Sequence, residues 1–289
     1  MRLHVLYRTH PGQNRKARPE YYSRSRALTS LRRSVAESGA PVSVSFVADG
    51  GLPDELSGAV HEGEQVHVVR GGSAAASMRA CLRVAEGLAR QDDGDVLYLL
   101  AEDDYLYRPE AVASLLAAAA AVPGADYLTL YTADGSAWFA THPSQPERQV
   151  SPLPGGPVAV GGAVWDRVRG TTSTFAVRSR ALREDGWLLR LGSRAGSPFD
   201  GATWHAVQGM APYSWRHLHR DLDPAPSVRG VGKVVAKPVM RVVVNLASRR
   251  RTAPRSRVLV APQEDLAMHL EEGLVPPGYD WARLAAETS

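Results

Sequence analysis

The sequence contains a single cysteine, Cys81, among 289 residues. One cysteine excludes an intramolecular disulfide and any zinc site built from several cysteines. No apolar run approaches the roughly 20 residues that a membrane-spanning helix needs. The N-terminal segment MRLHVLYRTHPG has only a short apolar run before basic residues, so we expect no secretory signal and a cytoplasmic protein.

Two phosphate-binding signatures are also missing. The chain contains neither the GxGxxG dinucleotide fingerprint nor the GxxxxGK[ST] phosphate loop. A Rossmann dehydrogenase and a P-loop kinase are therefore disfavoured. No nucleic-acid-binding motif is present either, so no specific nucleic-acid partner is expected.

The net charge of +4 is unevenly distributed. Arginines crowd the first forty residues and again residues 249–257. Such clusters attract polyanions, anionic lipids or phosphorylated ligands, although many basic clusters are simply solvated faces. We leave open a weak peripheral membrane contact through the late arginines and MRVVVNL, and also a homo-oligomer.

Apolar runs alternate with helical patterns over the first 132 residues. Strands are expected at residues 3–7, 42–47, 65–69, 95–100 and 127–131, with helices between them, including 74–90 and 109–121. This alternation predicts an α/β fold with a Rossmann-like, doubly wound and mainly parallel sheet. The chain therefore divides into residues 1–132, which carry this alternation, residues 133–235, and a C-terminal extension at residues 236–289.

The later part of the chain is less regular. Residues 133–170 are rich in Gly, Pro, Ser and Trp, which indicates an acceptor-side insertion or a flexible loop. A strand followed by a helix is expected over residues 171–191. The segment MRVVVNL, residues 240–246, reads as a strand, and a short amphipathic helix is expected at the C-terminus.

Three consecutive acids follow the apolar run Val96 to Leu100: Glu102, Asp103 and Asp104. Ligands of open α/β sheets bind beyond the carboxyl ends of such strands. Three adjacent carboxylates repel one another unless water or a cation compensates them. The triplet is therefore either a hard-cation site or a solvated loop that precedes the next helix.

Other candidate residues follow neighbouring strands. Asp49 could accept hydrogen bonds from a base or a ribose, and the backbone of Gly71-Gly72 could approach a phosphate. Arg79 and Arg83, one helical turn apart, could reach an anionic ligand. Each of these residues could instead have a structural role only: Asp49 as a turn former, the glycines as a tight loop and the arginines as a solvated face. However, Asp49, the glycines and the acids are all expected at one edge of the same sheet, which favours a shared binding site.

VADGG after the second strand, the Gly-rich turn after the third and YLLAEDDY after the fourth resemble the nucleotide-sugar half of a family 2-type GT-A glycosyltransferase. The acids are similar to that family's DxD motif, with Glu in place of the first Asp. The resemblance implies Asp104 as a ligand of Mn²⁺ or Mg²⁺. It places the nucleotide-sugar donor against residues that include Arg8, Asp49, Gly71, Arg79, Glu102 and Asp103.

The same resemblance implies a nucleotide-sugar-binding half at residues 1–132 and an acceptor-binding and catalytic-base half at residues 133–235. Asp200 precedes an expected helix that carries Trp204 and His205, and it is similar to the family's catalytic base. Glu184 and Asp185 are the alternative candidates for the base. Asp200 could instead be the N-cap of that helix, with no catalytic role. His219, or else His217, would supply a further metal ligand. The implied reaction transfers a sugar to a hydroxyl of a small-molecule or saccharide acceptor, with inversion. A nucleotidyltransferase and a non-catalytic nucleotide- or sugar-binding protein remain alternatives.

Overall fold

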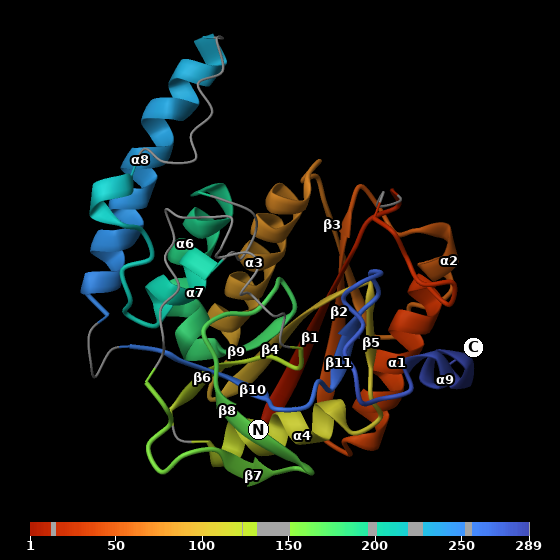
Figure 1. Cartoon of the computed structure of the whole chain (residues 1–289). Coiled ribbons are helices and arrows are strands. Elements are labelled where there is room, and N and C mark those ends of the chain that lie inside the picture. The colour runs from red at the N-terminus through yellow and green to blue at the C-terminus, as the bar shows by residue number, and fades with distance from the viewer. Residues whose placement is uncertain are drawn as a thin grey trace.

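One mixed sheet forms the centre of the protein, and helices cover both of its faces (Figure 1). The computed structural model describes residues 1–12, 16–122, 124–131, 151–195, 201–218, 228–251 and 256–288, and the backbone alone for residues 195, 217 and 228–235. Within these residues the sheet has nine strands, in the order β3-β2-β1-β4-β9-β6-β10-β8-β7. A separate pair, β5 and β11, lies beside it.

The strands of the described residues are β1 (Arg2–Thr9), β2 (Val42–Asp49), β3 (Gln65–Val69), β4 (Val96–Glu102), β5 (Tyr105–Tyr107), β6 (Ala125–Leu128), β7 (Val158–Val160), β8 (Ala163–Arg167), β9 (Phe175–Arg178), β10 (Val258–Pro262) and β11 (Ala267–His269). The helices are α1 (Arg24–Glu37), α2 (Asp54–Ser57), α3 (Ala74–Gln91), α4 (Ala111–Ala121), α6 (Ser179–Ala195), α7 (Gly201–Val207), the 3₁₀ turn η1 (Trp215–His217), α8 (Val228–Arg249) and α9 (Trp281–Glu287).

The first four strands of the sheet are parallel. β2 pairs with β1 and β3, and β1 pairs with β4 in a register that sets Arg8 opposite Glu102. Their carboxyl ends therefore meet at one edge. Beyond β4 the sheet becomes mixed, because β9 runs antiparallel to both β4 and β6 while β10 is parallel to β6. The expected α/β, Rossmann-like fold is confirmed.

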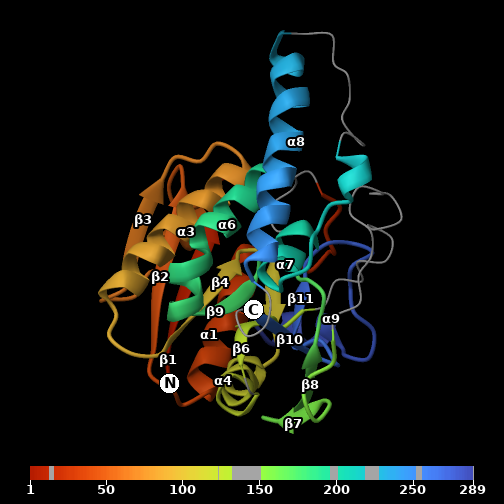
Figure 2. The ribbon, with the colours of Figure 1, turned by 90° about the vertical axis from the view of Figure 1, so that its left-hand side faces the viewer.

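Side chains of β4 show why this strand is apolar throughout. Leu97 and Leu99 point into a core shared with α1 and α4, and Tyr98 and Leu100 point into a second core shared with α3 and α6. A strand that is buried on both faces needs apolar residues at every position rather than at alternate ones. Figure 2 shows the helices of the second core in front of the sheet.

Several expectations from the sequence are wrong or shifted. Residues 133–170 are expected to form an acceptor-side insertion or a flexible loop; their described part contains the hairpin β7–β8 at the sheet edge, so that part is not a flexible loop. MRVVVNL is not a strand, because it lies inside α8, where Val244 packs into the second core and Val243 faces solvent. Burial of every third or fourth side chain against α6 and α7 overrides the strand preference of the valines. The fifth expected strand is β6, two residues earlier than predicted.

Residues 236–289 contribute to the middle of the fold. β10 lies between β6 and β8 in the sheet, and β11 pairs with β5 directly after the acid triplet. The boundaries of the three predicted segments themselves remain a prediction. Within the described parts of the chain, no helix is both long and apolar enough to cross a membrane.

Candidate active site

A cavity of about 600 Å³ lies at the carboxyl ends of β1 to β4. The turns after these four strands form its wall, so residues far apart in sequence meet there. Of the residues proposed for the donor and the metal, the cavity is lined by Arg8, Asp49, Gly71, Glu102, Asp103 and Asp104. This arrangement is the one expected for ligand binding by an open α/β sheet.

Each acid of the triplet is paired with a cationic or hydroxyl group. Arg8 at the end of β1 forms an ion pair with Glu102. Asp103 accepts a hydrogen bond from Thr9 and lies 3.0 Å from the Nε atom of Arg24. The acids thus form part of a network of paired charges, rather than an exposed acidic loop.

Asp104 has the most elaborate surroundings of the three. Its Oδ2 atom accepts a hydrogen bond from Arg18 Nη2 at 2.9 Å and lies 3.1 Å from His269 Nε2. Its Oδ1 atom is buried without a hydrogen-bond partner in the described part of the protein. A buried carboxylate oxygen that lacks a partner is costly, so this atom is available to a ligand that enters the cavity.

The two neighbouring aspartates differ in acidity. Burial raises the pKa of Asp103, and the negative charge of Asp104 raises it further, against the opposing hydrogen bond from Thr9. Burial also opposes ionisation of Asp104, but the hydrogen bond and charge of His269, together with Arg18, hold the pKa of Asp104 well below its usual range. Asp104 is therefore the member of the pair that stays anionic.

The glycine turn after β3 is held by Asp49. The Oδ1 atom of Asp49 accepts a hydrogen bond from the Gly71 backbone N–H at 2.6 Å and another from Gly72 at 3.4 Å. A Cβ atom at position 71 would lie 2.5 Å from Asp49 Oδ2 and 2.5 Å from the backbone nitrogen of Ser77. Glycine is thus required at position 71 by close packing, and Asp49 shapes the turn at the cavity wall.

Arg79 does not line the cavity. Its guanidinium donates to the Ser193 carbonyl at 3.4 Å, which ties α3 to the end of α6. Asp200 and His219 lie outside the described residues, and His217 is described by its backbone alone, in the turn η1. The roles proposed for Asp200, His217 and His219 therefore stay predictions.

The two alternative bases have other partners. Asp185 is fully buried and accepts hydrogen bonds from Tyr127 at 2.8 Å and from Arg257 Nε at 2.9 Å. Glu184 pairs with the same arginine. Asp185 has no solvent access through which an acceptor could reach it, so it holds α6 to β6 and to the segment before β10.

The sequence patterns reveal neither Arg18 and Arg24, which line the cavity, nor His269, which lies behind it against Asp104. This histidine reaches Asp104 because β11 pairs with β5, with His269 opposite Tyr105. The two rings stack, with centroids 4.9 Å apart, which fixes the imidazole. A three-residue strand carries no periodic signal; the only hint is a histidine within a short apolar stretch near the C-terminus.

The chemistry of Asp104 and His269 suits a divalent metal. Mn²⁺ and Mg²⁺ bind through few protein oxygens together with substrate phosphates, and imidazole is a common additional ligand. The buried, unpartnered Asp104 Oδ1 supports this fit. Among the described residues no cluster of three or more such side chains exists, so the protein would supply only part of the coordination shell.

No protein-family model matches the chain, and no curated protein matches its sequence. Among solved structures, it is similar to a CMP:2-keto-3-deoxy-manno-octonic acid synthetase complexed with CTP, with a TM-score of 0.40, 15% identity, and coverage of 65% of this chain and 78% of that one. It is similar to a glycosyltransferase involved in the glycosylation of the major capsid of PBCV-1, with a TM-score of 0.32, 11% identity, and coverage of 99% and 98%. Mouse xyloside xylosyltransferase 1 follows with a TM-score of 0.34, 12% identity, and coverage of 72% and 75%. Similarities at this level carry no activity over to this chain.

Proposed function

We propose that the protein is a glycosyltransferase that moves a sugar from a nucleotide-diphosphate sugar to an acceptor hydroxyl. The observation that carries the proposal is the meeting of the acid triplet, the glycine turn and several arginines in one cavity at the carboxyl edge of parallel strands. Its volume of about 600 Å³ lies within the range of small-molecule sites, roughly 300–1,000 Å³.

The donor diphosphate requires positive charge, and the cavity supplies it. Arg8, Arg18 and Arg24 lie among the acids and offset their charge, so the cavity does not repel an anionic ligand. Arg70 also lines the cavity, and its side chain has no ion-pair partner among the described residues. We assign Arg70 to the diphosphate and Asp49, beyond its role in the turn, to the base or the ribose.

The leaving group of glycosyl transfer is a nucleoside diphosphate, on which negative charge develops in the transition state. Asp104 and His269 would hold a divalent cation, which supplies Lewis-acid stabilisation of that charge when bound. Arg18, hydrogen-bonded to Asp104, adds a fixed positive charge beside the same position. Glu102 and Asp103 would lie beside the nucleotide or the sugar.

Asp200 is the proposed base for the acceptor hydroxyl. In the sequence it is the residue before Gly201, at which α7 begins, and α7 carries the buried Trp204. A carboxylate within hydrogen-bond reach of the hydroxyl can accept its proton as the oxygen attacks the anomeric carbon. In-line attack would then invert the anomeric centre.

Product analysis tests the proposed reaction. Incubation with a panel of nucleotide sugars, Mn²⁺ and mixed saccharide acceptors should release a nucleoside diphosphate. Release of pyrophosphate from a nucleoside triphosphate and a sugar phosphate would instead show a nucleotidyltransferase. Donor binding without turnover across the acceptor panel would show a non-catalytic binding protein.

Two variants separate the proposed roles. Asp104→Asn should abolish turnover and weaken donor binding, whereas Asp200→Asn should abolish turnover and leave donor binding unchanged. Asp200→Asn should unfold within a few degrees of the wild-type temperature, whereas Asp104→Asn leaves Arg18 and His269 without their carboxylate partner and should unfold at a lower temperature while staying folded in the assay. Near wild-type turnover in Asp200→Asn would remove Asp200 as the base.

A further inference from the structure

Helix α8 leaves an apolar face uncovered. The helix extends past the rest of the molecule in both views (Figures 1 and 2). Val239, Val243 and Leu246 recur along one side of it and are 57%, 41% and 48% exposed. The adjacent side carries Val244 and Ala247, which pack into the core beside α6 and α7. An apolar row of this kind on a projecting helix indicates an interaction surface.

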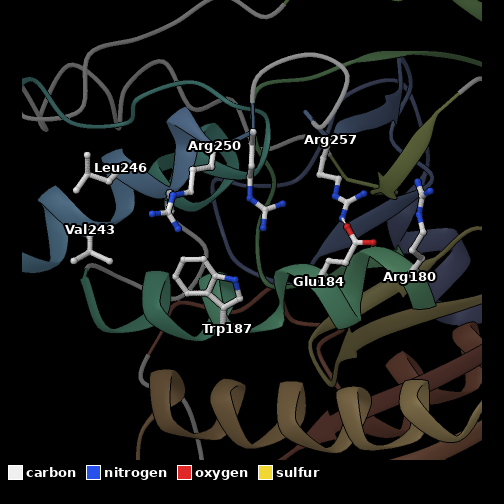
Figure 3. A pocket seen from close by; sticks show the side chains of 9 residues that line it. Arg180, Glu184, Trp187, Val243, Leu246, Arg250 and Arg257 are labelled. Carbon is white, nitrogen blue, oxygen red and sulfur yellow. Dashed lines mark hydrogen bonds and ion pairs between the residues drawn. The ribbon is translucent and has the colours of Figure 1, made fainter.

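The apolar row continues into a cavity between α6 and α8. The cavity holds about 650 Å³, and Trp187 of α6 faces Val243 and Leu246 of α8 across it (Figure 3). The Trp187 side chain is 45% exposed, which is unusual for so large an apolar group. Trp187, Val239, Val243 and Leu246, together with the basic residues at the end of α8, are called the α6–α8 surface below.

Positive charge outweighs negative charge around this surface: Glu184, the one acid that lines the cavity in the described residues, is already paired with Arg257. Residues 228–251 contain seven lysines and arginines and no Asp or Glu. Arg251 and Arg257 are committed to the buried Asp185, so they belong to the core network. Arg250 is exposed and, within the described residues, makes no side-chain ion pair, and Arg249 lies over the ring of Trp215 with 5.2 Å to the centroid.

We propose that the α6–α8 surface binds the anionic face of a phospholipid membrane. Valine, leucine and tryptophan side chains would enter the boundary between headgroups and acyl chains, and Arg249 and Arg250 would contact lipid phosphates. A helix that combines an apolar face with lysine and arginine and no acids has the composition of an interfacial membrane helix. Tryptophan is enriched at the same depth of a bilayer.

Charge argues against a second copy of the chain as the occupant. A two-fold symmetric contact would place the same basic patch on both sides, and helix α8 of the second copy would offer Arg249 and Arg250 no acidic partner, since residues 228–251 contain no Asp or Glu. Like charges opposed across an interface are unfavourable, whereas phosphate headgroups complement them. The membrane is therefore the occupant that matches both the apolar row and its basic border.

Vesicle cosedimentation of the full chain, without any sugar nucleotide, tests the proposal independently of catalysis. The protein should bind phosphatidylcholine vesicles that contain about one-third phosphatidylglycerol, and added salt should weaken this binding. It should not bind pure phosphatidylcholine. The double variant Val243→Glu/Leu246→Glu should lose binding, and Arg250→Gln should lower the partition about fivefold.

Matched controls lie on other faces of the molecule. Val68→Glu changes a 65% exposed valine on the edge strand β3, and Arg283→Gln changes an exposed arginine on α9; both should bind like wild type. Trp187→Phe should reduce the fluorescence quenching that brominated lipids cause in the wild type, and the exposed Trp215 beside Arg249 should account for part of the quenching that remains. Equal binding to neutral vesicles, or binding retained by the double variant, would overturn the proposal. If the wild type instead forms a dimer that the double variant abolishes, and does not bind vesicles, the partner of this surface is a second copy of the chain and not a membrane.

Discussion

His269 Nε2 lies 3.1 Å from Asp104 Oδ2, although 165 positions separate the two residues. Two contacts produce this closeness: β11 pairs with β5, and the imidazole stacks on Tyr105. The pair joins the last strand of the described chain to the acid triplet after β4. A metal held at Asp104 would thus depend on correct docking of the C-terminal segment.

Substitution of His269 should weaken the proposed metal site without unfolding the protein. His269→Gln keeps a polar side chain against Asp104 but removes the imidazole ligand. We expect at least about tenfold weaker Mn²⁺ affinity in the presence of a nucleoside diphosphate, because loss of even an outer-shell partner costs about 10–100-fold. Calorimetric titration measures the Mn²⁺ affinity of both proteins, and chelator-treated protein serves as the metal-free reference. Unchanged Mn²⁺ affinity in His269→Gln would exclude this histidine as a ligand.

Gly71→Ala should disrupt the turn that forms one wall of the cavity. The added Cβ atom would lie 2.5 Å from Asp49 Oδ2 and from the Ser77 nitrogen, so the turn or α3 must move. We expect nucleoside diphosphate binding to fall by tenfold or more, since the affected groups line the site. Thermal-shift titration with nucleoside diphosphates measures the loss.

Gly87→Ala is the matched control for this change. Gly87 lies within α3, and a Cβ atom there would meet nothing within 4 Å. Alanine in a helix interior should stabilise the protein by about 0.5–1 kcal/mol relative to glycine. Equal binding by Gly71→Ala and Gly87→Ala would contradict the role given to the turn.

Asp185→Asn should destabilise the fold while sparing catalysis. Asp185 is fully buried with Arg251, Arg257 and Tyr127, and removal of one member of a buried charge network costs about 3–5 kcal/mol. Glu184→Gln, at a side chain that is 58% exposed, should cost less than about 1 kcal/mol. Urea unfolding of the two variants gives the difference. Turnover lost from a fully folded Asp185→Asn protein would make Asp185 a candidate base again.

Cys81 should report on unfolding at alkaline pH. Burial raises the pKa of its thiol from 9.0 to about 12. Below pH 9 both the folded and the unfolded chain keep the proton. As the pH rises from 9 through about 12, only the unfolded chain releases it, so the stability that the buried thiol confers is lost.

A comparison of wild type with Cys81→Ala isolates this contribution. The free energy of unfolding should fall more steeply for the wild type than for Cys81→Ala between about pH 8 and about pH 10. Thiol reagents at about pH 8 should label Cys81 quickly in urea and slowly in the native protein. Parallel pH dependence of the two proteins would contradict the raised pKa.

Local pattern predicts the first half of the fold well. β4 is readable because it is apolar at every position from Val96 to Ala101, and α3 because apolar residues recur along one face from Met78 to Ala89. The carboxyl edges of parallel strands coincide by geometry, so the sequence alone suffices to place Asp49, Gly71 and Asp104 in one cavity.

Long-range pairing limits prediction of the second half. β10 enters the sheet beside β6, and β11 reaches β5, through contacts that no local pattern encodes. No local pattern therefore reveals His269, and the roles that the family resemblance gives to His217 and His219 stay predictions. The valines of α8 predict a strand for a related reason. They lie in a helix because Val244 and Ala247 pack against neighbouring helices, and the local sequence does not encode that packing.

The most direct test of the central claim is a thermal-shift screen of nucleoside diphosphates and nucleotide sugars, each with and without Mn²⁺, on the wild type and on Asp104→Asn. Ligands that bind only the folded state raise the unfolding temperature in proportion to the logarithm of their concentration over Kd. We predict that one base will stabilise the wild type, more strongly with Mn²⁺, and that Asp104→Asn will lose the Mn²⁺-dependent part. An absence of stabilisation by every nucleotide, or an equal shift in Asp104→Asn, would contradict a nucleotide-sugar site at the acid triplet.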